Sequence, residues 1–177
     1  NPKSHYDTFR DRIIFPIWDQ NGQVIGYTSR SIREGQNPKY LNSPESKVFN
    51  KRNLLYGLHL AKTSIREKDF AILVEGNMDQ IALYKSGFQN SVAVMGVALG
   101  QSSLDRLVGL TKNFYLALDS DNAGFMAMER INRQFLEKGL LPKALSFLPE
   151  KDPDEFISAH GPIAFQNLLD TAPVALD

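Results

Sequence analysis

The sequence predicts an α/β fold in which a parallel sheet is flanked by helices and preceded by a β-hairpin segment. Three nearly continuous apolar runs, at 70–75, 91–95 and 114–119, are separated by stretches with helical periodicity. Strands of this kind are typical of a parallel sheet whose two faces are both covered by helices. The 177 residues, 42% of them hydrophobic, are enough to form a buried core.

The N-terminal part of the sequence predicts a hairpin, a loop and a helix. Residues 12–18 and 23–30 are apolar or aromatic runs, and the Asn21-Gly22 pair between them is a strong hairpin signal. Residues 33–50 carry glycine, proline and polar side chains without periodicity, which predicts a long loop. Apolar residues recur at helical spacing from 54 to 68, which predicts an amphipathic helix.

Further elements are expected between and after the apolar runs. Periodicity predicts helices at 77–87, 102–110 and 122–138, then a short strand at 143–147 and short helices around 154–160 and 163–169. We therefore divide the sequence into a basic hairpin, loop and helix segment at 1–68, a sheet domain at 69–148, and an acidic loop with the start of a helical region at 149–177.

The composition excludes several classes of protein. With no cysteine, the chain has neither a disulfide framework nor a thiolate metal site. No stretch approaches the roughly 18 apolar residues of a transmembrane helix, and the first residues do not read as a signal segment. We expect a soluble, cytoplasmic protein without membrane contact.

The net charge of zero conceals two opposite halves. Residues 1–68 carry 12 Lys and Arg against 6 Asp and Glu, whereas residues 69–177 carry 8 against 14. A basic N-terminal part attracts polyanions and an acidic C-terminal part attracts cations, although an ordinary solvated surface gives the same charge imbalance.

Acidic side chains follow two of the predicted strands. Glu75 ends the first apolar run, and Asp79 falls in the first turn of the next helix. Asp119 and Asp121 end the third run and lie two residues apart. Because ligands of open parallel sheets bind outside the carboxyl ends of the strands, we expect these carboxylates to converge there.

Converging carboxylates predict a bound cation. They repel one another at low dielectric unless a cation neutralises them, and oxygen ligands without His or Cys select a hard ion such as Mg²⁺. Two such ions about 3.5–4 Å apart would serve phosphoryl or nucleotidyl transfer. Each acidic motif is alternatively a helix N-cap. Asp152 and Asp154 would complete the cation site or stabilise a helix start, and the second interpretation is favoured for that element alone.

Basic and aromatic side chains alternate in the N-terminal part. Such a mixture suits phosphate contacts and base stacking, although a solvated hairpin would look similar. The side chains in question are Arg10, Arg12, Arg30, Arg33, Lys39, Lys47, Lys51 and Arg52, interleaved with Tyr27, Tyr40 and Phe49. The residues alone thus indicate a Mg²⁺-dependent α/β domain that acts on phosphates.

The motifs resemble those of a known family. A strand that ends in EGNMD, followed by a strand that ends in DSD, resembles the Toprim domain of bacterial primases, topoisomerases and related nucleases. The order of RDRIIFPIWDQNGQVIGYTSR, PKYLNSPES, LLYGL, VEGNMD, DSDNAG and FLPEKDPDEFI is similar to the RNA polymerase domain of bacterial DnaG-type primases. PKYLNSP and LYGL are far more specific than the acids, and the resemblance covers nearly the whole chain.

That resemblance implies a Toprim-like sheet and a function. The function is synthesis of RNA primers on a single-stranded DNA template during replication, from ribonucleoside triphosphates with Mg²⁺ or Mn²⁺. The resemblance implies that Glu75, Asp119 and Asp121 are the catalytic, metal-binding carboxylates. It further implies additional acidic positions around the metals, which are Asp79, Asp152 and Asp154. The basic positions that it implies for template or nucleotide binding are Arg30, Lys39 and Lys51 and, less directly, Arg10 and Arg12.

Two positions depart from the family's pattern. Asn77 stands where the family usually has an aromatic residue after EG, and Ser120 stands where a glycine is common between the paired aspartates. Neither change removes a metal ligand.

The resemblance also implies parts of such primases beyond this sequence: an N-terminal zinc-binding domain, an earlier part of the polymerase domain, and a C-terminal domain that contacts the replicative helicase. We therefore expect no zinc site in this segment, weak or absent priming by the segment alone, and a location at the bacterial replication fork.

Two other functions stay open. Another Toprim enzyme, a DNA nuclease or a topoisomerase, would use similar acids, and a topoisomerase would also need a nucleophilic tyrosine, generally from a separate domain. A non-catalytic segment that binds single-stranded DNA, with purely structural acids, would bind its ligand regardless of Mg²⁺.

Overall fold

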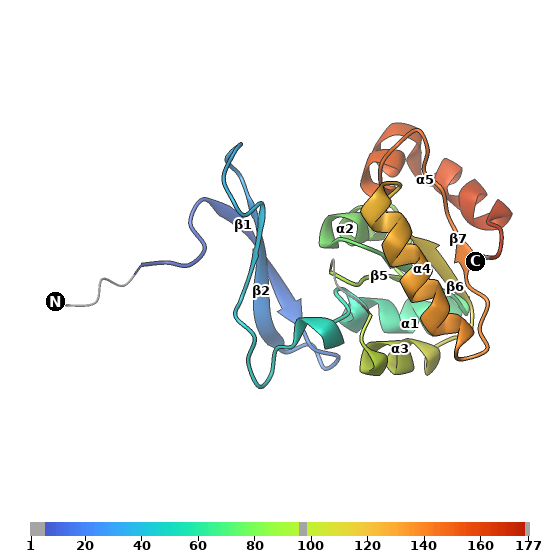
Figure 1. Ribbon diagram of the computed structural model, residues 1–177, viewed down its shortest axis with the longest axis horizontal. Coiled ribbons are helices and arrows are strands. Elements are labelled where there is room, and N and C mark those ends of the chain that lie inside the picture. Colours follow the sequence, from blue (N-terminus) through green and yellow to red (C-terminus); the bar gives the residue numbers. More distant parts are fainter. Residues whose placement is uncertain (1–5, 96–98, 176–177) are drawn as a thin grey trace. The chain divides into compact units, whose positions relative to one another are not determined.

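The computed structural model describes residues 6–95 and 99–175 (Figure 1). The chain forms two compact units, Asn1–Asn50 and Lys51–Asp177. No helix in the described ranges is long and apolar enough to traverse a bilayer.

The first unit is a three-stranded antiparallel sheet. Its strands are β1 (Arg12–Trp18), β2 (Val24–Ser31) and β3 (Tyr40–Asn42), in the order β1-β2-β3. The predicted hairpin is confirmed, and the Asp19 carboxylate closes its turn by accepting hydrogen bonds from the backbone of Asn21 and Gln23 at 2.8 and 2.9 Å. The predicted loop contains β3, which is too short to show periodicity and forms by pairing with the edge of β2.

The second unit is a four-stranded parallel sheet with helices around it, as the sequence predicts. The strands follow the order β5-β4-β6-β7. Its elements are η1 (Lys51–Asn53), α1 (Leu58–Lys68), β4 (Ala71–Val74), α2 (Asn77–Lys85), β5 (Ser91–Ala93), α3 (Gln101–Val108), β6 (Phe114–Ala117), α4 (Asn122–Leu136), β7 (Lys143–Ala144) and α5 (Pro153–Thr171).

Both faces of this sheet are buried, because helices cover each of them. Ala71 and Leu73 of β4 belong to one apolar cluster with buried residues of α1, α3, α4 and the neighbouring strands. Side chains alternate along a strand, so Ile72 and Val74 point to the opposite face, where they are fully buried as well. Helices α2 and α5 pack together, and Phe88, just beyond α2, lies 4.7 Å from Phe165 of α5 between ring centroids.

Several element boundaries differ from the sequence prediction for local reasons. Helix α1 begins at Leu58 rather than at 54, because Gly57 has a φ of +82° and the preceding Tyr56 pairs in an extended bridge with Ala93. The two predicted C-terminal helices are confirmed: they lie within the range given as α5 and meet at a kink where the backbone of Gly161 is non-helical, with a φ of +78° and a ψ of 175°. The predicted strand at 143–147 is only two residues long, Lys143–Ala144.

The two compact units meet at 50/51, whereas the division at 68 rests on charge and motifs along the sequence and stays a prediction. Helix α1 lies in the second unit because Leu58, Ala61 and Ile65 are buried in the core of the parallel sheet. The end of the basic sequence segment therefore supports the sheet that carries the acidic residues.

Truncating a core side chain of β4 is expected to destabilise the chain. Leu73 is fully buried, so Leu73→Ala should lower the free energy of unfolding by about 2–5 kcal/mol. Leu60 of α1 is about half exposed, and Leu60→Ala should cost less than about 1 kcal/mol. Urea unfolding followed by circular dichroism measures both, and equal losses would contradict the described core.

Candidate metal centre

The parallel sheet brings two carboxylates to one edge. Strands β4 and β6 are neighbours, with Val74 paired with Ala117 at their carboxyl ends. Glu75 directly follows β4, and Asp119 follows β6 after one intervening residue. Their shared edge therefore depends on strand pairing between segments more than 40 residues apart in the sequence.

The EGNMD motif has a structural reason for its glycine and its aspartate. Asp79 lies in the first turn of α2, where its Oδ2 accepts a hydrogen bond of 3.1 Å from the backbone of Gly76. The backbone amide of Asp154 also donates to this carboxylate. A Cβ atom at Gly76 would lie 2.9 Å from that Oδ2, so any larger residue would disturb the contact. Asp79 thus ties the start of α2 to the start of α5.

Two further aspartates cap helices. Asp121 is the N-cap of α4 and accepts a hydrogen bond of 2.9 Å from the backbone of Gly124. A Cβ atom at Gly124 would collide with the carbonyl oxygen of Asp119, which explains the glycine of DSDNAG. Asp152 is the N-cap of α5 and accepts 2.8 Å from the backbone of Glu155. In each case one carboxylate oxygen satisfies a free backbone donor of the helix start.

Glu75 and Asp119 differ from these capping acids. The Oε2 of Glu75 and the Oδ1 of Asp119 are buried and have no hydrogen-bond partner among residues 6–95 and 99–175. A buried acceptor without a partner is costly, and such groups in native structures call for a ligand, an ion or water. Oxygen donors of this type suit a hard cation such as Mg²⁺. Asn77, the departure from the family's pattern, is also buried with an unpartnered Nδ2.

Burial and mutual repulsion raise the pKa values of three of these carboxyls. Burial raises the pKa of Asp79 to about 7, with further contributions from Asp152 and Asp119. Burial followed by the charge of Glu75 raises the pKa of Asp119 to about 6. Burial and then Asp121 raise the pKa of Glu75 above its ordinary value. The predicted acids therefore lie within electrostatic range of one another, and their joint ionisation is unfavourable without a cation.

The acids are not gathered into a closed ligand cage. Within residues 6–95 and 99–175, no group of three or more Asp, Glu or His side chains is placed to hold one metal ion. Magnesium commonly takes only one or two protein carboxylates and completes its octahedron with water and substrate phosphates. The unpartnered oxygens of Glu75 and Asp119 are consistent with a magnesium site of this kind.

Two cations near the acids were missed by the sequence reasoning. The charges of Lys151 and Arg130 both lower the pKa of Glu75, and Lys151 also lowers that of Asp119. Lys151 directly precedes Asp152, so its place next to an acidic motif was the available signal. The backbone carbonyl of Lys151 accepts a hydrogen bond of 2.7 Å from the amide of Ser120, which ties this loop to the DSD segment.

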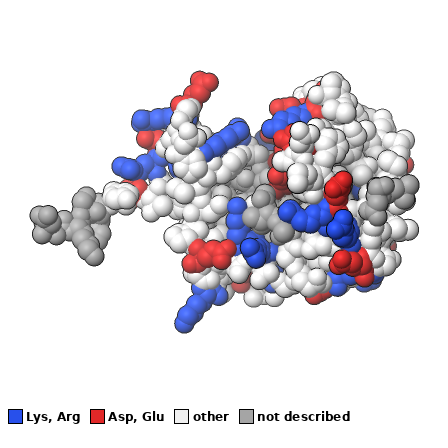
Figure 2. All heavy atoms as spheres, viewed as in Figure 1, with Lys and Arg blue, Asp and Glu red and all other residues white. Residues whose placement is uncertain are grey.

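The predicted basic residues lie mainly in the first unit. The Arg12 guanidinium donates to the carbonyls of Pro38 and Lys39 at 2.7 and 3.3 Å, so this side chain holds the loop that carries Lys39. Arg30 lies 6.0 Å from the Tyr40 ring centroid, within reach of a cation–π contact. Figure 2 shows basic side chains spread over the visible face, with acidic ones among them.

The other two basic residues are placed as follows. Arg10 lies 5.1 Å from the ring centroid of Tyr6. Lys51 opens η1 in the second unit. Contact of any of these five basic residues with nucleic acid or nucleotide stays a prediction.

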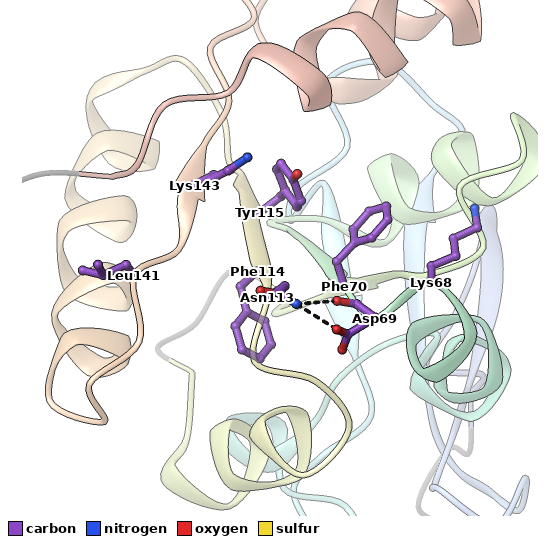
Figure 3. Close-up of a pocket in the computed structure, with 8 residues that line it drawn as sticks. All are labelled: Lys68, Asp69, Phe70, Asn113, Phe114, Tyr115, Leu141 and Lys143. Atoms are coloured by element: carbon purple, nitrogen blue, oxygen red, sulfur yellow. Dashed lines mark hydrogen bonds between the residues drawn. The ribbon is translucent and has the colours of Figure 1, made fainter.

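A cavity of about 310 Å³ lies at the opposite, amino-terminal edge of the parallel sheet (Figure 3). Its lining includes Phe70 before β4, Tyr115 of β6 and Lys143 of β7, whose ammonium lies 5.3 Å from the Tyr115 ring centroid. Asn113 donates hydrogen bonds to the carbonyl and the carboxylate of Asp69 at 2.9 and 3.1 Å. None of the sequence-predicted site residues lines this cavity, so it is separate from the carboxylate edge.

Comparison with protein families gives one match in the N-terminal part of the chain and a second over most of the remainder. Residues 1–62 match the family described as "DNA primase catalytic core, N-terminal domain", and residues 72–157 match the family described as "Toprim-like". The chain is 42% identical over 166 residues to the DNA primase of Staphylococcus aureus, with 94% of this chain and 27% of that protein covered.

Solved structures agree with this result. The crystal structure of the zinc-binding and RNA polymerase domains of Aquifex aeolicus primase matches with a TM-score of 0.91 and 38% identity, over 99% of this chain and 43% of that one. A DnaG primase catalytic domain bound to single-stranded DNA matches with a TM-score of 0.82 and 34% identity, over 96% and 54%. This chain thus spans about a quarter of the staphylococcal relative and about half of the solved catalytic domain.

The raised pKa values predict that the metal-free chain loses stability as the pH rises. A carboxyl with a raised folded-state pKa takes up protons that the unfolded chain has lost, so its stabilising contribution is complete below about pH 4 and is lost through pH 6–7. We expect the free energy of unfolding to fall by about 2 kcal/mol between pH 5 and pH 8 in chelator. Urea titrations at the two pH values measure this change.

Two controls accompany that measurement. Asp119→Asn should reduce the fall, whereas Asp105→Asn should not, because Asp105 is an exposed carboxyl of α3 whose pKa is lowered by Lys138. Addition of Mg²⁺ at pH 8 should restore the lost stability. A free energy of unfolding that stayed constant or rose towards pH 8 would contradict the described burial of the acids.

Proposed function

The chain belongs to the bacterial DnaG-type primase family, as a segment of the RNA polymerase domain that contains the Toprim domain, and on that premise we propose that it carries the nucleotidyl-transfer centre for RNA primer synthesis on single-stranded DNA. One observation supports this most strongly. Glu75 and Asp119, at the carboxyl edge of neighbouring parallel strands, each have a buried oxygen without a partner among the residues that the structure describes.

Glu75 and Asp119 are our principal candidates for metal ligands. Their unpartnered oxygens are available without breaking a hydrogen bond. Asp121 is the third catalytic candidate, because one of its oxygens caps α4 and the other remains for a ligand. Asp79, Asp152 and Asp154 support the site from the starts of α2 and α5. Together these acids make the electrostatic potential at the site more negative, which helps to attract dications.

Bound Mg²⁺ or Mn²⁺ would supply Lewis-acid polarisation of the triphosphate and a lower pKa for the attacking 3′-hydroxyl. The chain's own residues hold and orient the reacting groups. The rigid strand ends fix Glu75 and Asp119, and the capped starts of α4 and α5 fix the loops between them. No covalent protein intermediate is needed for this transfer.

We propose that the first unit contributes to the binding of template or nucleotide. Arg30, Lys39 and Arg10 offer phosphate contacts in this unit, and Arg12 holds the loop before Lys39. Lys51 of η1, in the second unit, offers a further phosphate contact. The ssDNA-bound relative supports single-stranded DNA as the partner. Contact with the replicative helicase is assigned to the C-terminal domain of the family, and the place of action is the bacterial replication fork in the cytoplasm.

The alternative functions are less well supported. A nuclease or topoisomerase would share the Toprim acids, yet the relatives reported above are DNA primases, and one N-terminal family match is specific to the primase catalytic core. A non-catalytic segment would leave the buried oxygens of Glu75 and Asp119 unexplained.

Replacing Asp119 tests the proposed function. Because this chain spans only 27% of the Staphylococcus aureus relative, the assay uses a chimaera: that full-length protein with its matching segment replaced by this chain. Asp119→Asn should lower primer synthesis on single-stranded DNA with four ribonucleoside triphosphates and Mg²⁺ by at least about 100-fold. Asp170→Asn, an exposed carboxyl on α5, is the matched control and should retain activity. Undiminished synthesis by Asp119→Asn would refute the proposal.

A further inference from the structure

Lys151 is held beside the acidic edge by its backbone. Its carbonyl accepts a hydrogen bond of 2.7 Å from the amide of Ser120, which lies between Asp119 and Asp121. Its amide donates to the Oε2 of Glu155 in the first turn of α5 at 3.1 Å. The residue is thus anchored on one side to the loop after β6 and on the other to α5, while its side chain is exposed.

The backbone contact with Ser120 fixes Lys151 beside the segment that carries Asp119 and Asp121. From there its side chain is within electrostatic range of both Glu75 and Asp119, whereas Arg130 of α4 is within range of Glu75. In the part of the chain that the structure describes, the Lys151 ammonium forms no ion pair. It is therefore an exposed cation near the acids that is not committed to an ion pair with any one of them.

We propose that Lys151 is a phosphate-binding residue of this site: its ammonium compensates the acids when metal is absent and contacts the phosphates of a bound ribonucleoside triphosphate when metal and nucleotide are present. This inference rests on the proposed function, because it assumes that dications and a triphosphate meet at Glu75 and Asp119. It adds a ligand-binding residue from the loop before α5, in a motif otherwise notable for its acids.

Charge arithmetic separates this role from a structural one. A lysine near a dication site repels the dication, so removal of the lysine should tighten the binding of metal alone. The same lysine attracts a triphosphate, so its removal should weaken the binding of nucleotide. For one charge about 8 Å from a dication in water, Coulomb's law gives a change of roughly 3- to 10-fold. A residue that only maintained the fold would affect both affinities in the same direction.

The test uses the 177-residue chain and three variants. Lys151→Gln removes the charge and keeps the length, and Lys151→Arg keeps the charge. Lys112→Gln is the matched control, because Lys112 is an exposed lysine that precedes β6 at the opposite edge of the sheet. Calorimetry measures the affinity for Mn²⁺ alone and then for ATP at saturating Mn²⁺, and urea unfolding checks that each variant is folded.

We expect Lys151→Gln to bind Mn²⁺ about 3- to 10-fold more tightly than the wild type and ATP with Mn²⁺ about 10-fold more weakly. Lys151→Arg and Lys112→Gln should bind both ligands as the wild type does. If Lys151→Gln matched the wild type, or weakened both affinities together, the role of Lys151 would be wrong while the metal site stood. If the wild-type chain bound no Mn²⁺, both this inference and the proposed function would be overturned.

Discussion

The burial of negative charge at one edge of the parallel sheet is the constraint on which the rest of this structure depends. Glu75 and Asp119 are carried there by adjacent strands, and each has a buried oxygen without a partner in the described part of the chain. Desolvation and mutual repulsion both oppose their ionisation, as the pKa of Asp119, about 6, shows. A dication that neutralises Glu75 and Asp119 therefore stabilises the folded state. The stability of the second unit and its proposed chemistry thus depend on the same two carboxylates.

Helix starts around this edge fix the remaining acids. Asp121 and Asp152 cap α4 and α5, and Asp79 bridges the starts of α2 and α5. Each of these aspartates uses at least one oxygen to accept from backbone amides, so hydrogen bonds within the chain hold the helix starts at this edge. Such preorganisation lowers the cost of orienting a substrate. Capping and ligand binding are therefore compatible roles for the same acidic motif.

Much of the fold was predictable because its strands and helices have strong patterns, and the order of the motifs, above all PKYLNSP and LYGL, pointed to the family. The short strand β3 was not, because three residues carry no period and their pairing with β2 is a tertiary effect. Nor could the sequence separate Glu75 and Asp119 from the capping acids, since an aspartate after a strand suits either role. The place of Lys151 depends on a loop that folds back onto Ser120, which spacing along the chain does not reveal.

Anomalous diffraction from crystals of this chain soaked with Mn²⁺ at pH 8 tests the central claim most directly. The account predicts a peak that lies about 2.1 Å from both the Oε2 of Glu75 and the Oδ1 of Asp119, or two peaks that share these carboxylates. Mn²⁺ bound elsewhere, or no peak while both oxygens hydrogen-bond to groups of the protein, would contradict it.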